Sequence, residues 1–467
     1  MNIKEIKHAY FIGIGGIGMS ALARYLLSRG ARVSGYDRTP TALTDELTRE
    51  GMDIHFEDNP DLLPPDADLV VYTPAIPDDH RELNHYRRAS AELRKRSEVL
   101  GAVTESSPTI AVAGTHGKTT VSTMAAHFLR GGGLECSAFL GGIAVNYDSN
   151  FLAGREDLVV VEADEYDRSF LRLTPETIIL NSMDADHLDI YETAENVRAS
   201  FLEFIHRLGP GGTLFAAAGL PLTGADLPGA DRNLRFFALE GESEGDTADY
   251  LARNIRVSGG AYEFELRVPE DVVPGGVISD LRLNMGGRHN ARNAVAALAA
   301  ALERKCPPEE LRRALADFRG VRRRFEYAHR APGNVLIDDY AHHPEELRGL
   351  ISSAREMYPE HRLEIVFQPH LFSRTRDFAD GFAESLALAD GVYLLPIYAA
   401  REEPMPGVSS AMLAERMDGI DPVLPRDGRE LLERLRERKP GVLLMAGAGD
   451  ISDLVEPVRE LMAASDQ

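Results

Sequence analysis

Short runs of apolar, β-branched residues alternate with amphipathic helical stretches along most of this chain. Clear examples of the apolar runs are residues 9–14 (AYFIGI), 109–114 (TIAVAG) and 157–163 (DLVVVEA). Strands that alternate with helices build parallel sheets, so the pattern predicts an α/β fold.

The alternation has breaks that indicate how the chain is divided. Joints are expected near residues 105–110 and 318–327, each just before a new strand. A Gly-, Pro- and Asp-rich interval at 219–287 interrupts the βα rhythm. Within it, the alternating stretch 261–268 (AYEFELRV) predicts antiparallel strands added to the middle domain.

Bulk properties exclude several classes of protein. The 467 residues carry a net charge of −23, which argues against nucleic acid or an anionic membrane surface as the main partner. No apolar run approaches the roughly 18 residues of a membrane span, and the first residues lack the apolar core of a signal peptide. Cys136 and Cys306 are the only cysteines, so a disulfide framework is excluded. We expect a soluble, cytoplasmic protein.

The stretch GTHGKTT predicts a phosphate-binding loop between a strand and a helix. The first glycine of the usual pattern is replaced by Val112, but the remaining loop has the expected chemistry. Backbone N–H groups of the glycines would face phosphate, Lys118 would reach the β- and γ-phosphates, and Thr119 would bind Mg²⁺. The predicted ATP-binding residues of this loop are Gly114, Thr115, His116, Gly117, Lys118, Thr119 and Thr120.

A second glycine loop, GIGGIG, follows the first predicted strand and opens a helix. Its glycines are Gly13, Gly15, Gly16 and Gly18, and Asp37 follows at the end of the next strand. This arrangement suits a dinucleotide such as NAD, but any diphosphate could use the same helix N-terminus. A glycine-tolerant turn without a ligand is the simpler alternative.

Acidic and amide side chains gather near the predicted phosphate loop. Carboxylates at the carboxyl ends of parallel strands face the same crevice as such a loop, and hard oxygen ligands suit Mg²⁺. The two acidic clusters are Glu162, Asp164, Glu165 and Asp167, and Asp184, Asp186, His187 and Asp189. His289, Asn290 and Asn293 begin a later helix, where their side chains suit either a purine edge or N-terminal capping.

Six motifs occur in an order that resembles the Mur ligases, the ATP-dependent amino-acid ligases of peptidoglycan synthesis. They are GTHGKTT, EADEYD, DADHLD, GRHNARN, RRRFE and DDYAHHP. The resemblance implies a UDP-sugar-binding N-terminal domain (1–106), a central ATP- and Mg²⁺-binding domain (107–324) and a closing C-terminal domain (325–467). The two outer domains would be Rossmann-like and the central one of the phosphate-loop ATPase type.

GIGGIGMSA, DADH and FQPHLFSRTRD resemble the members that join L-alanine to the carboxylate of UDP-N-acetylmuramate through an acyl phosphate. The resemblance assigns catalytic roles to Lys118, Glu165, His187, Arg324 and His343. Thr119, Glu165 and His187 would bind Mg²⁺, with Glu162 and Asp164 as alternatives to Glu165. ATP would also contact His289, Asn290, Asn293, Arg324 and Asp339. The sugar nucleotide would contact Gly13, Gly15, Gly16, Gly18, Asp37, Thr73 and His187. Residues near the amino acid would be His342, His343, His370, Arg374 and Arg376, with His342 or His343 as base.

Alternatives stay open at this point. EADEYD also resembles the related ligase that recycles murein tripeptide, and the first loop alone fits an NAD-dependent dehydrogenase. A non-enzymatic scaffold switched by ATP is a third class, although switching alone does not need both acidic clusters. Several Mur ligases hold a second Mg²⁺ with a carbamylated lysine, but no lysine lies between Lys118 and Lys305. The protein is expected to be a monomer or a dimer.

Overall fold

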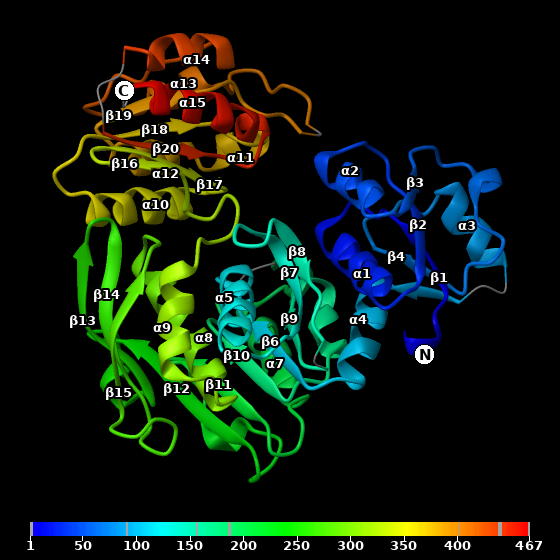
Figure 1. Cartoon of the computed structure of the whole chain (residues 1–467). Helices are drawn as coiled ribbons and strands as arrows, with labels where there is room; N and C mark the ends of the chain where they lie inside the picture. The colour runs from blue at the N-terminus through cyan, green and yellow to red at the C-terminus, as the bar shows by residue number, and fades with distance from the viewer. Residues whose placement is uncertain are drawn as a thin grey trace. The chain divides into compact units, whose positions relative to one another are not determined.

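The computed structural model describes residues 3–89, 92–155, 157–184, 188–400, 402–437 and 441–465. It contains three β-sheets, each flanked by helices (Figure 1). The chain divides into two compact units. The first comprises residues 1–253, 265–281 and 292–315, and the second comprises residues 254–264, 282–291 and 316–467.

The N-terminal sheet is parallel and five-stranded, with the order β3-β2-β1-β4-β5. Its strands are β1 His8–Ile12, β2 Arg32–Tyr36, β3 Asp53–His55, β4 Leu69–Tyr72 and β5 Leu93–Lys95. Its helices are α1 Ile17–Ser28, α2 Ala42–Arg49, α3 Arg81–Arg88 and α4 Arg96–Glu105. All five residues of β1 are buried, because a central parallel strand is covered on both faces.

The central sheet has ten strands in the order β15-β14-β13-β12-β11-β10-β6-β9-β7-β8. The strands from β6 to β10 are β6 Thr109–Ala113, β7 Ser137–Ala144, β8 Ser149–Leu152, β9 Val159–Glu162 and β10 Thr177–Leu180. The others are β11 Thr213–Ala217, β12 Asn233–Leu239, β13 Tyr250–Ser258, β14 Ala261–Arg267 and β15 Val277–Leu283. The helices are α5 Lys118–Gly131, α6 Leu188–Tyr191, α7 Ala194–Ile205, α8 Arg288–Glu303 and α9 Pro308–Asp317.

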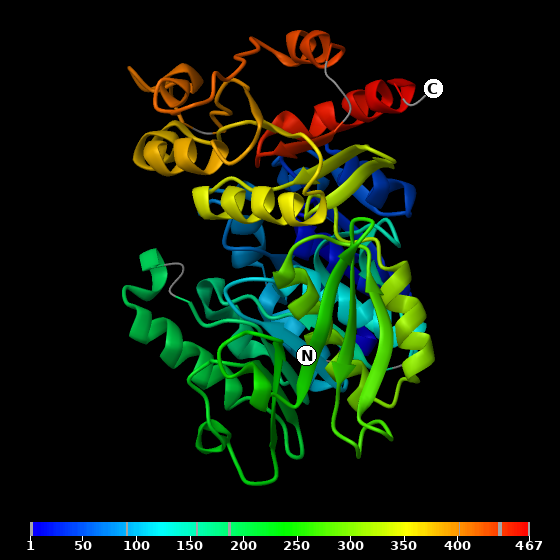
Figure 2. The same cartoon turned by 90° about the vertical axis from the view of Figure 1, so that its left-hand side faces the viewer.

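The central sheet is mixed, as the sequence predicts. The strands from β7 to β13 along the sheet order pair in parallel, whereas β7 and β8 form an antiparallel hairpin. β13 and β14 are neighbours joined by only two residues, which makes that pair antiparallel (Figure 2). The alternating stretch 261–268 therefore forms the antiparallel strand that its pattern predicts.

The C-terminal sheet has the order β16-β17-β20-β18-β19, with one antiparallel pair, β16–β17, at its edge. Its strands are β16 Glu326–Ala331, β17 Asn334–Asp339, β18 Leu363–Phe367, β19 Gly391–Leu394 and β20 Val442–Ala446. Its helices are α10 Pro344–Met357, α11 Phe372–Asp377, α12 Ala379–Leu386, α13 Ser410–Ala414, α14 Gly428–Leu435 and α15 Val455–Ser465. Short 3-10 helices occupy Ile3–Glu5, Pro60–Leu62, Tyr166–Arg172, Gly224–Asp226, Gly245–Thr247 and Asp450–Leu454.

Helix α1 packs on the β7–β8 hairpin within the first unit. Tyr25 of α1 contacts Phe139 and Phe151, with ring centroids 5.2 and 6.0 Å apart. The buried Asn150 donates a hydrogen bond to Ser20 Oγ at 2.9 Å, and its other amide contacts are the Ile17 carbonyl and the Arg24 guanidinium. This contact holds the N-terminal end of α1 against the central sheet. Across the residues that the structure describes, no helix is both long and apolar enough to span a membrane.

Candidate active site

The phosphate loop lies between the buried strand β6 and helix α5, as predicted. Gly114 and Gly117 have φ angles of +130° and +81°, which disfavour any residue with a side chain. A Cβ on Gly117 would also lie 2.6 Å from Asn181 Nδ2 and 2.9 Å from Asn293 Oδ1. Asn181 donates to Asn293 at 2.9 Å, so the two amides form a wall against the loop. The loop shape therefore requires glycine on grounds of both strain and space.

Lys118 is the first residue of α5, and its ammonium group is folded into the loop. Lys118 Nζ donates to the Gly114 carbonyl at 2.8 Å and contacts Glu165 Oε1 and Oε2 at 2.8 Å each. The Glu165 side chain is 1% exposed and that of Lys118 is 14% exposed. Tyr191 supports this acid by donating to the Glu165 backbone carbonyl at 2.6 Å. A cation and an anion are thus held together at the place where the pattern predicts phosphates.

Glu162 forms a second carboxylate position beside the loop. Thr119 Oγ1 donates to Glu162 Oε1 at 3.1 Å, and the Gly141 N–H donates to Oε2 at 3.0 Å. Burial raises the pKa of the Glu162 carboxyl, and the nearby Lys118 charge and the Thr119 hydrogen bond oppose that rise. A hydroxyl and two carboxylates are hard oxygen donors, so the chemistry of this set fits Mg²⁺. Among the residues that the structure describes, no three His, Cys, Asp or Glu side chains lie together as a metal site, either at this loop or elsewhere.

Ser182 ties the loop to the end of strand β10. Ser182 Oγ lies 2.8 Å from Thr115 Oγ1 and accepts the His116 N–H at 3.0 Å. The Asp184 N–H donates to Thr115 Oγ1 at 3.3 Å, so the second acidic motif does reach the loop. The predicted metal ligand His187 lies outside the described residues, as does Asp186. Thr120 is buried in the first turn of α5.

The predicted adenine-side residues begin helix α8. Asn293 is buried and contacts the phosphate loop through Asn181. Asn290 is also buried, and its Nδ2 donates to the Gly286 carbonyl at 2.7 Å, which is a local contact with the backbone of the preceding turn. The ring of His289 packs over Gly287, because a Cβ there would lie 2.5 Å from His289 Cε1. Of the three, Asn293 is the one that touches the loop in the first unit.

The N-terminal glycine loop has the predicted strand–loop–helix form. Gly13 adopts a φ of +87°, and the Gly15 N–H donates to Asp37 Oδ2 at 2.7 Å. Asp37 therefore holds the loop itself. Gly16 and Gly18 line a cavity of about 350 Å³ with Thr73, and Glu162 and Asp164 line the same cavity. The predicted sugar-nucleotide loop and the acids beside the phosphate loop thus share one space in the first unit.

The arginine-rich joint belongs to the second unit. Arg323 and Phe325 adopt positive φ angles of 59° and 49°, which non-glycine residues rarely do. Asp339 Oδ2 accepts the Phe325 N–H at 2.7 Å and Oδ1 accepts the Ala341 N–H at 2.8 Å, so this acid braces the joint. Burial raises the Asp339 pKa to about 6. The Arg324 guanidinium lies 5.6 Å from the centre of the Tyr340 ring.

Two of the predicted histidines cluster in the second unit. The rings of His342 and His370 lie 6.2 Å apart, and Arg374 Nη1 is 3.4 Å from His370 Nδ1. Burial lowers the pKa of both histidines, and the Arg374 charge lowers that of His370 further. His343 caps helix α10 and packs on Phe378, whereas Arg376 pairs with Asp377 at 2.7 Å. The structure brings together His342, His370 and Arg374, and gives the other two local partners.

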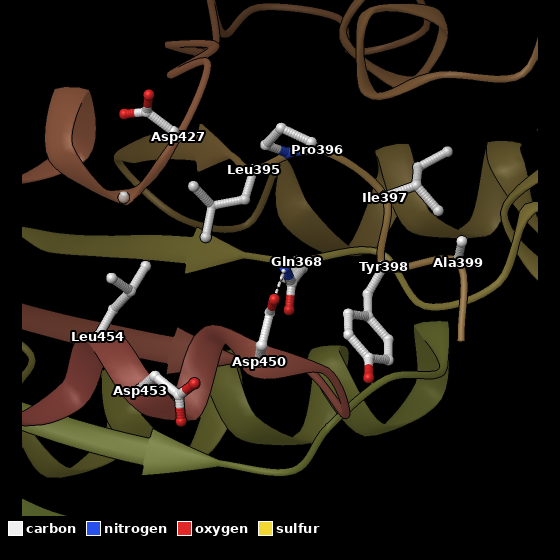
Figure 3. A pocket seen from close by; sticks show the side chains of 11 residues that line it. Gln368, Leu395, Pro396, Ile397, Tyr398, Ala399, Asp427, Asp450, Asp453 and Leu454 are labelled. Carbon is white, nitrogen blue, oxygen red and sulfur yellow. Dashed lines mark hydrogen bonds between the residues drawn. The ribbon is translucent and has the colours of Figure 1, made fainter.

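A further cavity of about 390 Å³ lies beyond the carboxyl ends of β18, β19 and β20 (Figure 3). Gln368 lines this cavity. Its Nε2 donates to Asp450 Oδ1 at 2.6 Å, and its Oε1 accepts the Ile451 N–H at 2.9 Å. Tyr398 lines the cavity and stacks on His370 at 5.8 Å. This cavity therefore adjoins the histidine cluster.

Several site residues escape the motif-based reading. Asn181 and Ser182 directly precede the second acidic cluster in the sequence, but only the charged residues of that cluster are predicted as site residues. Gly141 and Arg96 lie outside every motif, and only the fold brings them to the site. Asn181 and Ser182 could have been identified from their position, because residues at the end of a strand beside a phosphate loop face the site.

The phosphate site lies between a strand and a helix, and acids lie beside its lysine. Together with three sheets flanked by helices, these features define a nucleotide-using α/β enzyme with several domains. Family comparison matches residues 8–107 to "Mur ligase family, catalytic domain", 112–301 to "Mur ligase middle domain" and 323–450 to "Mur ligase, glutamate ligase domain". The chain belongs to the Mur ligase family. The predicted fold class, ligase class and dependence on ATP are therefore confirmed.

Individual relatives agree over the full length. A UDP-N-acetylmuramate–L-alanine ligase of Parabacteroides distasonis is 46% identical over 468 residues, covering 99% of this chain and 98% of that protein. The crystal structure of UDP-N-acetylmuramate-alanine ligase from Thermotoga maritima has a TM-score of 0.81 and 28% identity, with coverage of 99% and 100%. A murein peptide ligase from Psychrobacter arcticus has a TM-score of 0.66 at 22% identity, covering 98% of each chain, which shows a shared fold alone.

Proposed function

We propose that this protein joins L-alanine to the carboxylate of UDP-N-acetylmuramate, with ATP converted to ADP and phosphate. The observation that carries the proposal is the shared cavity, in which the N-terminal glycine loop and Glu162 line one space of about 350 Å³. A substrate held at the glycine loop can therefore extend toward the phosphate loop. The full-length relative at 46% identity supports the choice of substrates.

The chemistry requires an activated acyl group. A carboxylate is a poor acceptor for an amine because its leaving group would be oxide. Transfer of the γ-phosphoryl group gives an acyl phosphate, which the neutral amine of L-alanine attacks; the tetrahedral intermediate then expels phosphate and forms the amide. Lys118 neutralises charge on the transferring phosphoryl group, and its two 2.8 Å contacts with Glu165 keep the ammonium in place.

Mg²⁺ would be held by the Thr119 hydroxyl with the carboxylates of Glu162 and Glu165. Bound there, it would neutralise charge on the ATP phosphates. Gly141 positions Glu162 through its N–H, and a Cβ at residue 141 would lie 2.1 Å from Glu162 Oε2. His187 stays a predicted ligand of a second Mg²⁺.

The amine of L-alanine must lose a proton before it attacks. Burial lowers the pKa of His342, so its imidazole is neutral at pH 7 and can accept that proton. His343 is the other base predicted from the sequence, but its capping role in α10 favours His342. Arg374 beside His370 would attract the carboxylate of the amino acid.

In this proposal, each of the three predicted domains has a role. Residues 1–106 bind the UDP end, residues 107–324 bind ATP and Mg²⁺, and residues 325–467 close over ATP and the amino acid. Arg324 and Asp339 would contact the nucleotide from the closing part. The glycine loop in this account binds a diphosphate, which replaces the NAD-dependent dehydrogenase as an explanation of GIGGIG.

Phosphate release with single omissions tests the proposal. ATP hydrolysis should need UDP-N-acetylmuramate, L-alanine and Mg²⁺ together, and leaving out any one should reduce it to background. Replacing L-alanine by murein tripeptide separates the recycling ligase from the proposed enzyme. Turnover with the tripeptide and none with L-alanine would reverse the assignment, and nicotinamide-dependent turnover would remove it.

A further inference from the structure

The cavity shared by the glycine loop and the acidic strand end has two walls of different origin. One wall consists of the first turns of α1, from Gly16 to Leu22, with Arg96 and Leu100 of α4. The other consists of residues 139–141 of β7, with Glu162 at the end of the neighbouring strand β9 and Asp164 just after that strand. The packing of Tyr25 on Phe139, and the hydrogen bonds of Asn150 to α1, hold the two walls together. The cavity is therefore formed by packed secondary-structure elements of the first unit.

Arg96 is the one basic side chain that lines this cavity in the part of the chain that the structure describes. It is the first residue of α4 and is half-buried. Its guanidinium packs on Gly18, because a Cβ at residue 18 would lie 2.9 Å from Arg96 Nη1. A bulkier residue at position 18 would push the guanidinium out of this place.

The Arg96 guanidinium has no hydrogen-bond or ion-pair partner among residues 3–89, 92–155, 157–184, 188–400, 402–437 and 441–465. By contrast, the buried Arg24 is paired with Glu46 and Glu50, and the half-buried Arg235 is paired with Asp249. Withdrawing a cation from water without a partner is costly, so such a position is expected to be completed by an anionic ligand.

Arg96 and the first turn of α1 both favour a negatively charged ligand. Helix α1 begins at Ile17 beside Arg96, and the first turn of a helix attracts anions. Asp37 already accepts the Gly15 N–H, so the loop amide at residue 15 is occupied and the anion must use the α1–Arg96 side. Arg96 also lines a small recess with Glu162 and Asp164, where its charge offsets their repulsion of an anionic substrate.

We infer that Arg96 binds the diphosphate of the sugar-nucleotide substrate, clamping it against the first turn of α1. The inference rests on the proposed function for the identity of the sugar nucleotide. Arginine is suited to this role because its planar fork can donate two parallel hydrogen bonds to phosphate oxygens. Arg96 thereby sets the position from which the carboxylate reaches the phosphoryl site.

The test measures binding of UDP and of UDP-N-acetylmuramate by calorimetry. A non-hydrolysable ATP analogue is present so that no turnover occurs. Arg96→Ala should weaken both ligands by a similar factor of about ten- to a hundredfold, the range for charge-assisted hydrogen bonds. Arg96→Lys keeps the charge without the fork and should lose less. Arg94→Ala is the matched control, since Arg94 is exposed and pairs with Glu92 at 3.1 Å.

Three results would overturn the inference. The first is wild-type affinity for UDP in Arg96→Ala, and the second is an equal loss in Arg94→Ala. The third is a loss confined to UDP-N-acetylmuramate, which would move Arg96 to the carboxylate of the substrate. If Arg96→Ala is unfolded by circular dichroism, Arg96→Lys carries the same comparison. Failure of the proposed function gives a different signature, in which the wild-type protein binds UDP but releases no phosphate with L-alanine.

Discussion

Lys118 and Glu165 form a buried ion pair, with Lys118 Nζ 2.8 Å from each carboxylate oxygen. The same ammonium also contacts the Gly114 carbonyl, so the loop, its lysine and the acid are one unit. Incoming phosphate must share this lysine with Glu165. The pair therefore links the stability of the site to its chemistry.

Removal of the lysine should affect both properties. Lys118→Ala should lower turnover by about 10²–10³, because a group that stabilises the transferring charge is lost. It should also lower the free energy of unfolding by about 3 kcal/mol, since Glu165 would keep its buried charge without the lysine. Urea denaturation and phosphate release measure the two effects. Adding Glu165→Gln should restore stability but not turnover; an unchanged unfolding energy in Lys118→Ala would contradict the buried pair.

Gly117→Ala should prevent ATP binding. The new Cβ would meet Asn181 Nδ2 at 2.6 Å and Asn293 Oδ1 at 2.9 Å, and the residue would keep a strained φ of +81°. Gly133 provides the control, because its φ is +95° but a Cβ there meets nothing within 4 Å. Gly133→Ala should cost only the backbone strain of about 1 kcal/mol and leave ATP affinity unchanged. Equal ATP affinity in the two variants would show that the amide wall is unimportant.

Asp338 gives a pH dependence whose sign follows from burial. Burial raises its pKa from 3.8 to about 7, with Arg323 opposing and Glu326 and Asp339 adding to the rise. The folded protein holds this proton more tightly than the unfolded chain, so the associated stability is complete below about pH 4 and is lost as the pH rises through 7. The free energy of unfolding of Asp338→Asn, minus that of the wild type, should therefore rise by about 2–3 kcal/mol as the pH is raised from 5 to 8.

Thermal or urea unfolding at both pH values measures this difference. The exposed Asp380, which pairs with Arg416 at 2.9 Å, supplies the control variant Asp380→Asn. A constant difference between Asp338→Asn and the wild type across this range would show that Asp338 ionises normally in the folded protein.

Bicarbonate should have no effect on activity. A carbamylated lysine cannot support the second metal here, because no lysine lies between Lys118 and Lys305 and arginine does not form a stable carbamate. Turnover should be the same in buffers freed of carbon dioxide and in buffers with added bicarbonate. His187→Ala should weaken the Mg²⁺ dependence without rescue by bicarbonate. A requirement for bicarbonate would mean that the second metal site lies elsewhere.

The sequence predicts the fold well because its signals are local. Strand–glycine–helix units and buried β-branched runs depend on neighbours in the chain, and they identify β1, β6 and the phosphate loop. The acids beside the loop were also predictable, since Glu162 ends strand β9 and Glu165 follows it three residues later. Local patterns thus carry most of the architecture and the phosphate-binding half of the site.

Partners that depend on tertiary packing were not predictable in the same way. Arg96 is distant in sequence from Gly18 and reaches it only because α4 packs beside α1. The resemblance places Asp37 among the contacts of the sugar nucleotide, and in the structure its carboxylate accepts the Gly15 N–H. His342 and His343 are adjacent in sequence, yet the start of α10 turns one into a cap and leaves the other facing His370. Such differences arise from side-chain geometry that a one-dimensional pattern does not contain.

Isotope transfer tests the central claim, that this protein makes an amide through an acyl phosphate on UDP-N-acetylmuramate. The substrate is prepared with ¹⁸O at both carboxylate oxygens and incubated with ATP, Mg²⁺ and L-alanine, and the product and released phosphate are analysed by mass spectrometry. We predict a product that contains one L-alanine, with one ¹⁸O atom in each phosphate released. Unlabelled phosphate accompanying amide formation would contradict the acyl phosphate, and the absence of any alanine-containing product would contradict the assigned reaction.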